Sequence, residues 1–288
     1  MTIRTLLVPI CGGPEDHAAL EMAANLARRF EAHVEVLHLR RDSREGMPYL
    51  GDGASGAMIE EIIVATEREA DDKASRLKQQ FDKWRAAHAI AAAESPPTPG
   101  GASAAWRQEI GPEDQVVAHH GRLTDLIVLP RPDLKIDLAS LVFESALLRT
   151  GRPLLLAPSA AGPNTQFATV AIAWNGSAEA ARALAAARPF LATASRVIAI
   201  TANGDGNNAA PTPNLLSYLA WHGIKAEALV VEAKAVSEGA ALLDETRRRK
   251  ADLLVMGAYT HSRVRQMVFG GVTRHILAHA ELPLLMAH

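Results

Sequence analysis

Short apolar runs alternate along this chain with longer stretches in which apolar residues recur at helical spacing. Leu6–Ile10, Leu126–Leu129 and Leu253–Met256 are apolar throughout. A strand without polar positions is buried on both faces, which is typical of a parallel sheet covered by helices on each side. The pattern predicts an α/β protein with doubly wound parallel sheets.

The same order of runs occurs twice. Aligning Gly12 with Gly176 sets an offset of 164, which also places Leu20 on Leu184. Near the ends of the halves, the run 125–130 matches 252–257 at an offset of 127, and each half closes with a run that begins at a proline (153–157 and 283–287). This repeat predicts two tandem doubly wound domains, over residues 1–160 and 165–288, with 160–164 as the linker.

The two offsets differ by 37, so the first half carries 37 extra residues between 41 and 101. Residues 51–56 are typical of a loop, and residues 57–93 have the pattern of one long helix. One interpretation is a lid or an arm that binds a partner. The other, which we favour, is an elongated crossover helix that covers its own sheet.

Composition narrows the class of protein. The chain has 288 residues, is 48% hydrophobic and carries a formal net charge of -2, which does not indicate a broad nucleic-acid surface. Cys11 is the single cysteine, so no intrachain disulfide is expected. The sequence has no secretory signal pattern and no apolar run of the roughly 18 residues that a membrane span requires. We therefore expect a cytoplasmic protein that contacts neither membranes nor nucleic acid.

The most informative segment is 257–274, which follows a strand and runs into a helix predicted to begin near Gly271. Ligands of open α/β sheets bind at the carboxyl ends of strands. A helix N-terminus offers free N–H groups to an anion, and glycine lets the backbone approach a phosphate closely. Thr273 adds a hydroxyl at the same place. The segment is a candidate phosphate loop.

This segment resembles the G-x2-G-x9-G-[ST] motif of nucleotide-binding universal stress proteins. Gly257 and Gly270 match the first and third glycines, whereas Thr260 replaces the second glycine and Gly271 replaces the Ser or Thr. The family's V-D-G-S turn is represented by 174–177 in the second half and by 10–13 in the first. The resemblance covers both halves, so the chain resembles a tandem universal stress protein with an adenine nucleotide alpha hydrolase-like fold.

The resemblance implies a site for ATP or AMP in the second half. Adenine and ribose would lie near Ala173, Asn175 and residues 201–202. The phosphates would face Gly257, Thr260, Gly270, Gly271, Val272 and Thr273. Asn175 stands where the family often has Asp and lacks the charge that helps to hold Mg²⁺, so the need for Mg²⁺ is left open and no metal site is predicted.

The first half lacks the elements of such a loop. Residues 130–133 read Pro-Arg-Pro-Asp, and no glycine occurs from 130 to 150. We therefore expect no phosphate cradle in that half. Its turn 11–16 faintly resembles the phosphate loop of ATP pyrophosphatases, but a turn in which Glu15 and Asp16 favour a helix start fits better.

Three other signals favour ordinary structural roles. Cys11 precedes a helix, where a thiolate is favoured, yet a lone cysteine is more often simply buried. His275 and His279 have the i, i+4 spacing that zinc sites use, but no further ligand accompanies them. The basic run 247–250 closes a predicted helix, where cations are favoured.

The leading hypothesis is a stress-response protein that acts by binding, without a catalytic residue; slow ATP hydrolysis is left open. The alternative is a scaffold or adaptor that binds no nucleotide and works through the long helix of residues 57–93. A third hypothesis, an ATP-using enzyme built on the turn at Cys11, has the least support. We expect the halves to pack as a pseudo-dimer within the chain. A further homodimer and the identity of any protein partner are left open.

Overall fold

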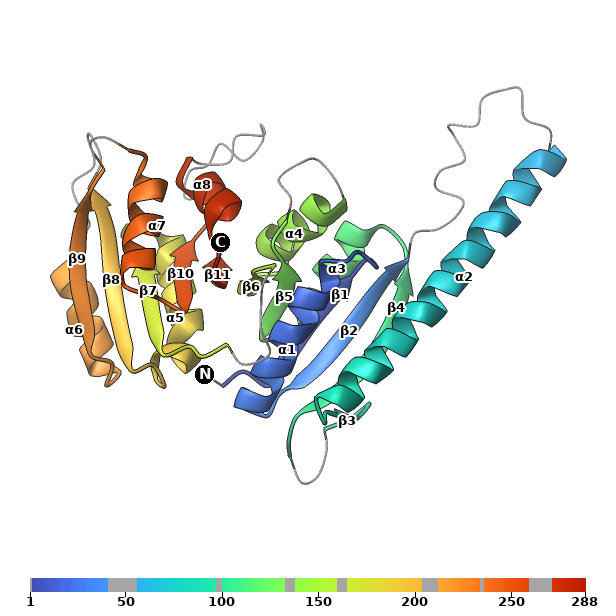
Figure 1. Ribbon diagram of the computed structural model, residues 1–288, viewed down its shortest axis with the longest axis horizontal. Coiled ribbons are helices and arrows are strands. Elements are labelled where there is room, and N and C mark those ends of the chain that lie inside the picture. Colours follow the sequence, from blue (N-terminus) through green and yellow to red (C-terminus); the bar gives the residue numbers. More distant parts are fainter. Residues whose placement is uncertain are drawn as a thin grey trace.

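The computed structural model describes residues 2–40, 56–96, 100–132, 138–159, 165–203, 212–233, 236–258 and 271–288. In both halves, strands and helices alternate as predicted (Figure 1). The first half contains β1 (Thr5–Ile10), α1 (Asp16–Phe30), β2 (His33–Arg40), α2 (Gly56–Ala87), β3 (Ala91–Ala92), β4 (Ser103–Ile110), α3 (Glu113–Gly121), β5 (Leu126–Pro130), α4 (Leu138–Arg149) and β6 (Leu154–Ala157).

The second half repeats this order without the short strand β3. It contains β7 (Thr169–Ala173), α5 (Ala178–Leu191), β8 (Arg196–Asn203), α6 (Thr212–Trp221), β9 (Ala226–Glu232), α7 (Glu238–Arg248), β10 (Leu253–Gly257), α8 (Gly271–His279) and β11 (Leu284–Ala287). The predicted start of α8 at Gly271 is confirmed. The predicted linker 160–164 lies outside the described residues.

The described strands form one continuous sheet in the order β3-β4-β2-β1-β5-β6-β11-β10-β7-β8-β9. Neighbouring strands are parallel within each half. The one antiparallel pair joins the halves, with Leu155 of β6 opposite Leu285 of β11. The two halves therefore lie against each other as predicted and share a sheet.

The sheet is covered on both faces because its strands are apolar on both faces. On one face, Val170 and Ile172 of β7 belong to a core cluster with residues of α1 and α5. On the other, Ala171 and Ala173 belong to a cluster with residues of α3, α4, α7 and α8. The buried runs seen in the sequence thus become the central layer of a three-layer α/β fold.

The inserted helix ends earlier than predicted. The sequence pattern predicted a helix over 57–93, but α2 ends at Ala87. Ala89 adopts a left-handed conformation (φ 53°), and the Ile90 N–H donates to the Arg85 carbonyl. These two features are those of a Schellman cap. Ala91 and Ala92 then pair with β4 at the edge of the sheet, so strand pairing overrides the helix propensity of this alanine-rich stretch.

The two ends of α2 have different surroundings. Near its C-terminus, Phe81 and Trp84 are buried against the sheet, and the Trp84 indole N–H donates to the Leu20 carbonyl of α1. Near its N-terminus, Met58 and Val64 are 55% and 42% exposed, and Figure 1 shows this end extending past β2 and β4. The helix covers its sheet, as favoured, over only part of its length.

An aromatic cluster packs across the junction of the two halves. Phe30 at the end of α1 meets Phe190 of α5 edge to face, with 5.3 Å between ring centroids. Phe167 contacts the same ring at 5.0 Å. The Arg29 guanidinium lies 5.4 Å from the Phe167 ring and donates to the Thr193 hydroxyl. This cluster and the pair β6–β11 are two separate contacts that hold the halves together.

Replacing Phe190 tests the contribution of this cluster. We expect Phe190→Ala to lower the free energy of unfolding by about 3–5 kcal/mol, because the ring is fully buried and its removal leaves a cavity. Urea denaturation measures this loss. Leu123→Ala is the control, since Leu123 is 89% exposed and should change stability little. A loss below about 1 kcal/mol for Phe190→Ala would contradict a structural role for the cluster.

Candidate functional site

The candidate site lies where the strand order of the second half reverses direction. From β7, the chain continues to β8 on one side, whereas β10 lies on the other side. The helix that follows β7, α5, packs on one face, and the helix that follows β10, α8, packs on the opposite face. A crevice at the carboxyl ends of two such strands is the usual ligand position in open α/β sheets. The register places Met256 beside Ala173, so Gly257 and Trp174 follow at one edge.

The turn after β7 is held by its own side chains. Gly176 has φ 76°, a conformation that favours glycine. The Asn175 side-chain oxygen accepts a hydrogen bond from the Ser177 N–H at 3.1 Å. The Ser177 hydroxyl caps α5 by accepting from the Ala180 N–H at 3.1 Å. Asn175 is exposed and Ala173 is buried, so the structure places both at the predicted strand end.

Gly257 has a packing role that the sequence did not reveal. A Cβ atom at this position would lie 2.5 Å from the Ala180 nitrogen and 2.9 Å from the Glu179 Cβ. Glycine therefore lets β10 approach the N-terminus of α5 whether or not a ligand is present.

The N-terminus of α8 contains the remaining predicted residues that the structure describes. Among the described residues, no heavy atom lies within 4 Å of a Cβ atom built on Gly271, so this part of the chain leaves room for a larger residue. Val272 packs against Gly239 of α7, and Thr273 is buried. Figure 1 places α8 beside α7. The other two predicted phosphate ligands, Thr260 and Gly270, lie outside the described residues.

A buried hydroxyl lies close to this edge of the sheet. Thr201 follows Ile200, whose carbonyl accepts the Trp174 N–H at 2.9 Å. The Thr201 side chain is 2% exposed, and its oxygen has no hydrogen-bond partner within the described part of the chain. A buried hydroxyl without a partner is costly, so this group is available to a ligand or to water.

The matching turn in the first half is built differently. The Asp16 carboxylate, at the start of α1, accepts the N–H groups of Cys11, Gly12 and Gly13 at 3.1, 2.6 and 3.1 Å. Lys73 of α2 lies over Gly12. The sequence indicated only that Asp16 favours a helix start and did not reveal either contact.

Burial is the main cause of the raised pKa of both titratable groups in this turn. It raises the pKa of the Cys11 thiol to about 12, with the nearby Asp16 and Glu113 carboxylates adding to the shift. It also raises the pKa of Asp16 to about 6, although the three N–H donors act in the opposite direction. Cys11 is therefore a thiol at neutral pH, and it is half-buried rather than fully buried.

The residue that follows β5 contacts the second half of the chain. Arg131 follows Pro130, the residue aligned with Gly257, and donates to the Leu282 carbonyl of the second half at 3.4 Å. Burial lowers the pKa of its guanidinium. This position in the first half contacts the other half instead of facing a crevice.

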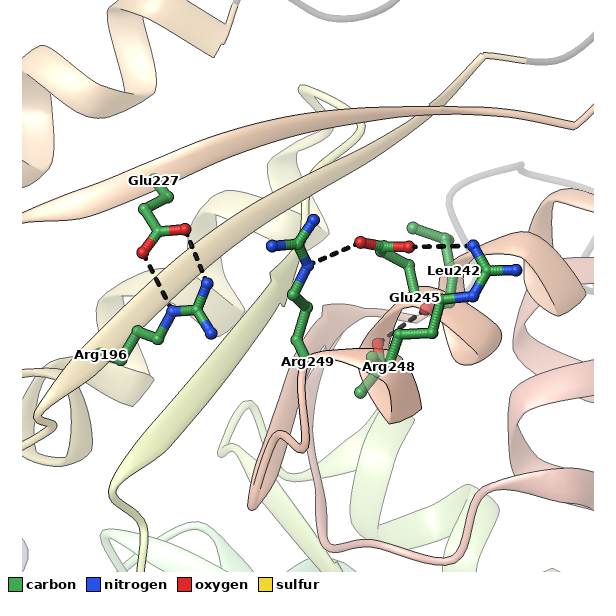
Figure 2. A network of polar contacts seen from close by, with 7 residues as sticks. Arg196, Glu227, Leu242, Glu245, Arg248 and Arg249 are labelled. Carbon is green, nitrogen blue, oxygen red and sulfur yellow. Dashed lines mark hydrogen bonds and ion pairs between the residues drawn. The ribbon is translucent and has the colours of Figure 1, made fainter.

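The histidines and the basic run have local partners. His275 and His279 stack at 4.3 Å, and no group of three His, Cys, Asp or Glu side chains suited to a metal occurs in the described part of the chain. In the basic run, Arg248 and Arg249 both pair with Glu245, at 3.5 and 2.7 Å. Figure 2 shows this network beside the pair formed by Arg196 and Glu227. Two arginines of the run thus share one carboxylate of the same helix, α7.

The duplicated fold, with parallel strands and helices on both faces of the sheet, defines a tandem doubly wound α/β protein. The sequence pattern of the universal stress protein family matches residues 2–138 and 166–288, and the chain belongs to this family. Within the described residues, no helix is long and apolar enough to cross a membrane.

Solved structures agree with this assignment. A universal stress protein from Archaeoglobus fulgidus DSM 4304 is similar over 98% of this chain and 97% of its own, with 18% identity and a TM-score of 0.68. A putative universal stress protein from Pseudomonas aeruginosa UCBPP-PA14 is similar over 99% of this chain and 93% of its own, with 14% identity and a TM-score of 0.56. A comparison with curated protein sequences finds no match. The coverage and TM-scores show that these proteins share the fold of this chain.

The raised pKa of Cys11 gives a direct prediction. Because the thiolate fraction at pH 8 is very small, we expect Cys11 to react with a disulfide reagent at least ~100-fold more slowly than free cysteine. The chain has one cysteine, so the absorbance change reports this residue alone. Denatured protein is the control and should react at the free rate. Rapid labelling of the folded chain would contradict the burial of this thiol.

Proposed function

We propose that this chain is a cytoplasmic stress-response protein that binds one adenine nucleotide, ATP or AMP, in its second half. The observation that carries the proposal is the reversal of strand order at β7, which has β8 on one side and β10 on the other. This edge of the sheet carries Asn175 on one strand end and Gly257 on the other. Ligands of doubly wound sheets bind at such a point.

The adenosine part of the ligand would lie at the ends of β7 and β8. Ala173 is the last residue of β7, and the exposed Asn175 amide adds hydrogen-bonding groups at the surface. The buried Thr201 hydroxyl supports this placement, because it lacks a partner within the described residues. A ribose or base polar atom is a group that would satisfy it.

The phosphates would lie at the start of α8. Its first residues are Gly271, Val272 and Thr273, and the N–H groups and partial positive charge of a helix N-terminus attract an anion. Gly257 faces the N-terminus of α5. We extend the proposed phosphate contacts to Thr260 and Gly270 on the strength of the family motif.

We propose that the protein itself supplies few ligands to any Mg²⁺ that accompanies the nucleotide. Asn175 has no charge, and its side-chain oxygen already accepts the Ser177 N–H. A neutral oxygen engaged in this way is a poor ligand for a divalent cation. Mg²⁺ that accompanies ATP would be held mainly by the phosphates.

The chain is proposed to act by binding and not as an enzyme. Catalysis of ATP hydrolysis needs a group that orients the attacking water at the γ-phosphate. No residue of the candidate site has been assigned that role.

A second candidate function is a scaffold that works through α2 without nucleotide. The exposed Met58 and Val64 on the projecting end of the helix favour it. Exposed apolar side chains that gather on one element are a common feature of protein-binding surfaces.

Calorimetric titration with ATP and AMP, with and without Mg²⁺, tests the nucleotide proposal. We expect about one site per chain, lost in Gly270→Asp because a carboxylate there would repel the phosphates. Gly100→Asp is the matched control, since Gly100 is exposed and has no heavy atom within 4 Å of a built Cβ. If folded protein that is free of copurified ligand releases no heat of binding, the nucleotide proposal is wrong and the scaffold function is favoured.

Restoring the family's hydroxyl at residue 271 is the complementary test. Gly271→Ser fits the open space around this position and adds a hydrogen-bond donor at the proposed phosphate contact. We expect nucleotide to bind about 5-fold more tightly, as one added hydrogen bond of about 1 kcal/mol allows. Gly100→Ser is the control. Unchanged or weaker binding in Gly271→Ser would argue against phosphate at the start of α8.

A further inference from the structure

Three backbone N–H groups in the first half converge on a single atom. The Cys11, Gly12 and Gly13 amides all donate to the same oxygen of the Asp16 carboxylate, at 3.1, 2.6 and 3.1 Å. Gly12 has φ 81°, which lets consecutive amides point to one side. Successive N–H groups arranged in this way form a concavity that suits an anion. Here the anion is part of the chain.

The inserted helix α2 covers this turn. A Cβ atom built on Gly12 would lie 3.0 Å from the Lys73 Nζ and 3.1 Å from the Leu77 side chain. The Asp16 side chain is 8% exposed. A cation and an apolar side chain of α2 thus lie over the turn, and the carboxylate lies within it.

The second half has no equivalent of this carboxylate. The offset of 164 between the halves places Asp16 on Ala180, whose methyl group accepts no hydrogen bond. The turn at 175–177 is held instead by the Asn175 and Ser177 side chains. The two turns share an origin, but only the first contains its own anion.

We propose that the Asp16 carboxylate acts as a built-in anion that occupies the strand-end turn of the first half and keeps it closed to external anions beneath α2. The contact is autoinhibitory, because it uses the N–H groups that an external anion would need. The first half then differs from the second in two ways. It lacks a glycine loop after β5, and the N–H groups of its strand-end turn already donate to Asp16. This inference does not depend on nucleotide binding in the second half.

The proposal is tested by removing the Asp16 carboxylate in Asp16→Ala and adding a small carboxylate, formate, to the solution. The probe is sodium formate, titrated into the full-length chain against sodium chloride at equal ionic strength, and the readout is the amide NMR resonances of Cys11, Gly12 and Gly13. In Asp16→Ala, we expect formate to shift these three resonances saturably, whereas chloride does not. In the wild-type chain we expect no such shift, because Asp16 fills the turn.

Glu15→Ala is the matched control. Glu15 is the exposed neighbour of Asp16, so this variant removes one carboxylate near the same helix end without emptying the turn. It should behave like the wild-type chain. The proposal is overturned if formate leaves the Asp16→Ala amides unmoved, or if it shifts those of the wild-type chain equally.

A second variant applies if Asp16→Ala does not fold. Asp16→Asn keeps the shape of the side chain but replaces a charged acceptor with a neutral one. We expect hydrogen exchange at the Cys11, Gly12 and Gly13 amides to become about 10-fold faster, while the amides of β1 are unchanged. Exchange rates equal to those of the wild-type chain would overturn the proposal.

Discussion

The antiparallel pairing of β6 with β11 is the contact on which the remaining architecture depends. Each strand would otherwise be the edge of its own sheet, with unpaired N–H and C=O groups and apolar side chains. When the strands are paired, the five leucines and one methionine of 154–156 and 284–286 are fully buried. Within the described strands, only β3 and β9 remain at the edges of the sheet. The aromatic cluster at Phe190 and the hydrogen bond from Arg131 to the Leu282 carbonyl add to this junction, so that two repeats fold into one body.

A pair of domains within one chain can diverge in a way that a symmetric homodimer cannot. In a homodimer, every substitution occurs in both subunits. Here Asp16 fills the turn of the first half, whereas the aligned position of the second half is Ala180. Pro130 aligns with Gly257, which leaves room for the start of α5, and the next residue of the first half, Arg131, contacts the opposite half. The 37 extra residues, found in the first half only, supply the helix that covers its turn. Fold is conserved between the repeats, and the chemistry of the strand ends is not.

Much of this arrangement follows from local sequence patterns. The apolar runs, their repetition and the start of α8 at Gly271 were predictable because burial and helix starts leave a periodic signal. The end of α2 was predicted wrongly, since residues 88–93 are rich in alanine and their pairing with β4 depends on distant residues. The convergence of three amides on Asp16 and the close approach at Gly257 depend on tertiary packing in the same way. A glycine in a motif, such as Gly257, can therefore be required by close packing of the backbone as well as by a ligand.

The central claim is that one chain has one nucleotide site and that this site lies in the second half. Photolabelling with an azido-adenine nucleotide, followed by peptide mapping, tests the position directly. The account predicts saturable labelling, displaced by unlabelled ATP or AMP, in peptides from 165–288. Saturable labelling confined to peptides from 2–159 would contradict it, as would labelling that unlabelled nucleotide does not displace.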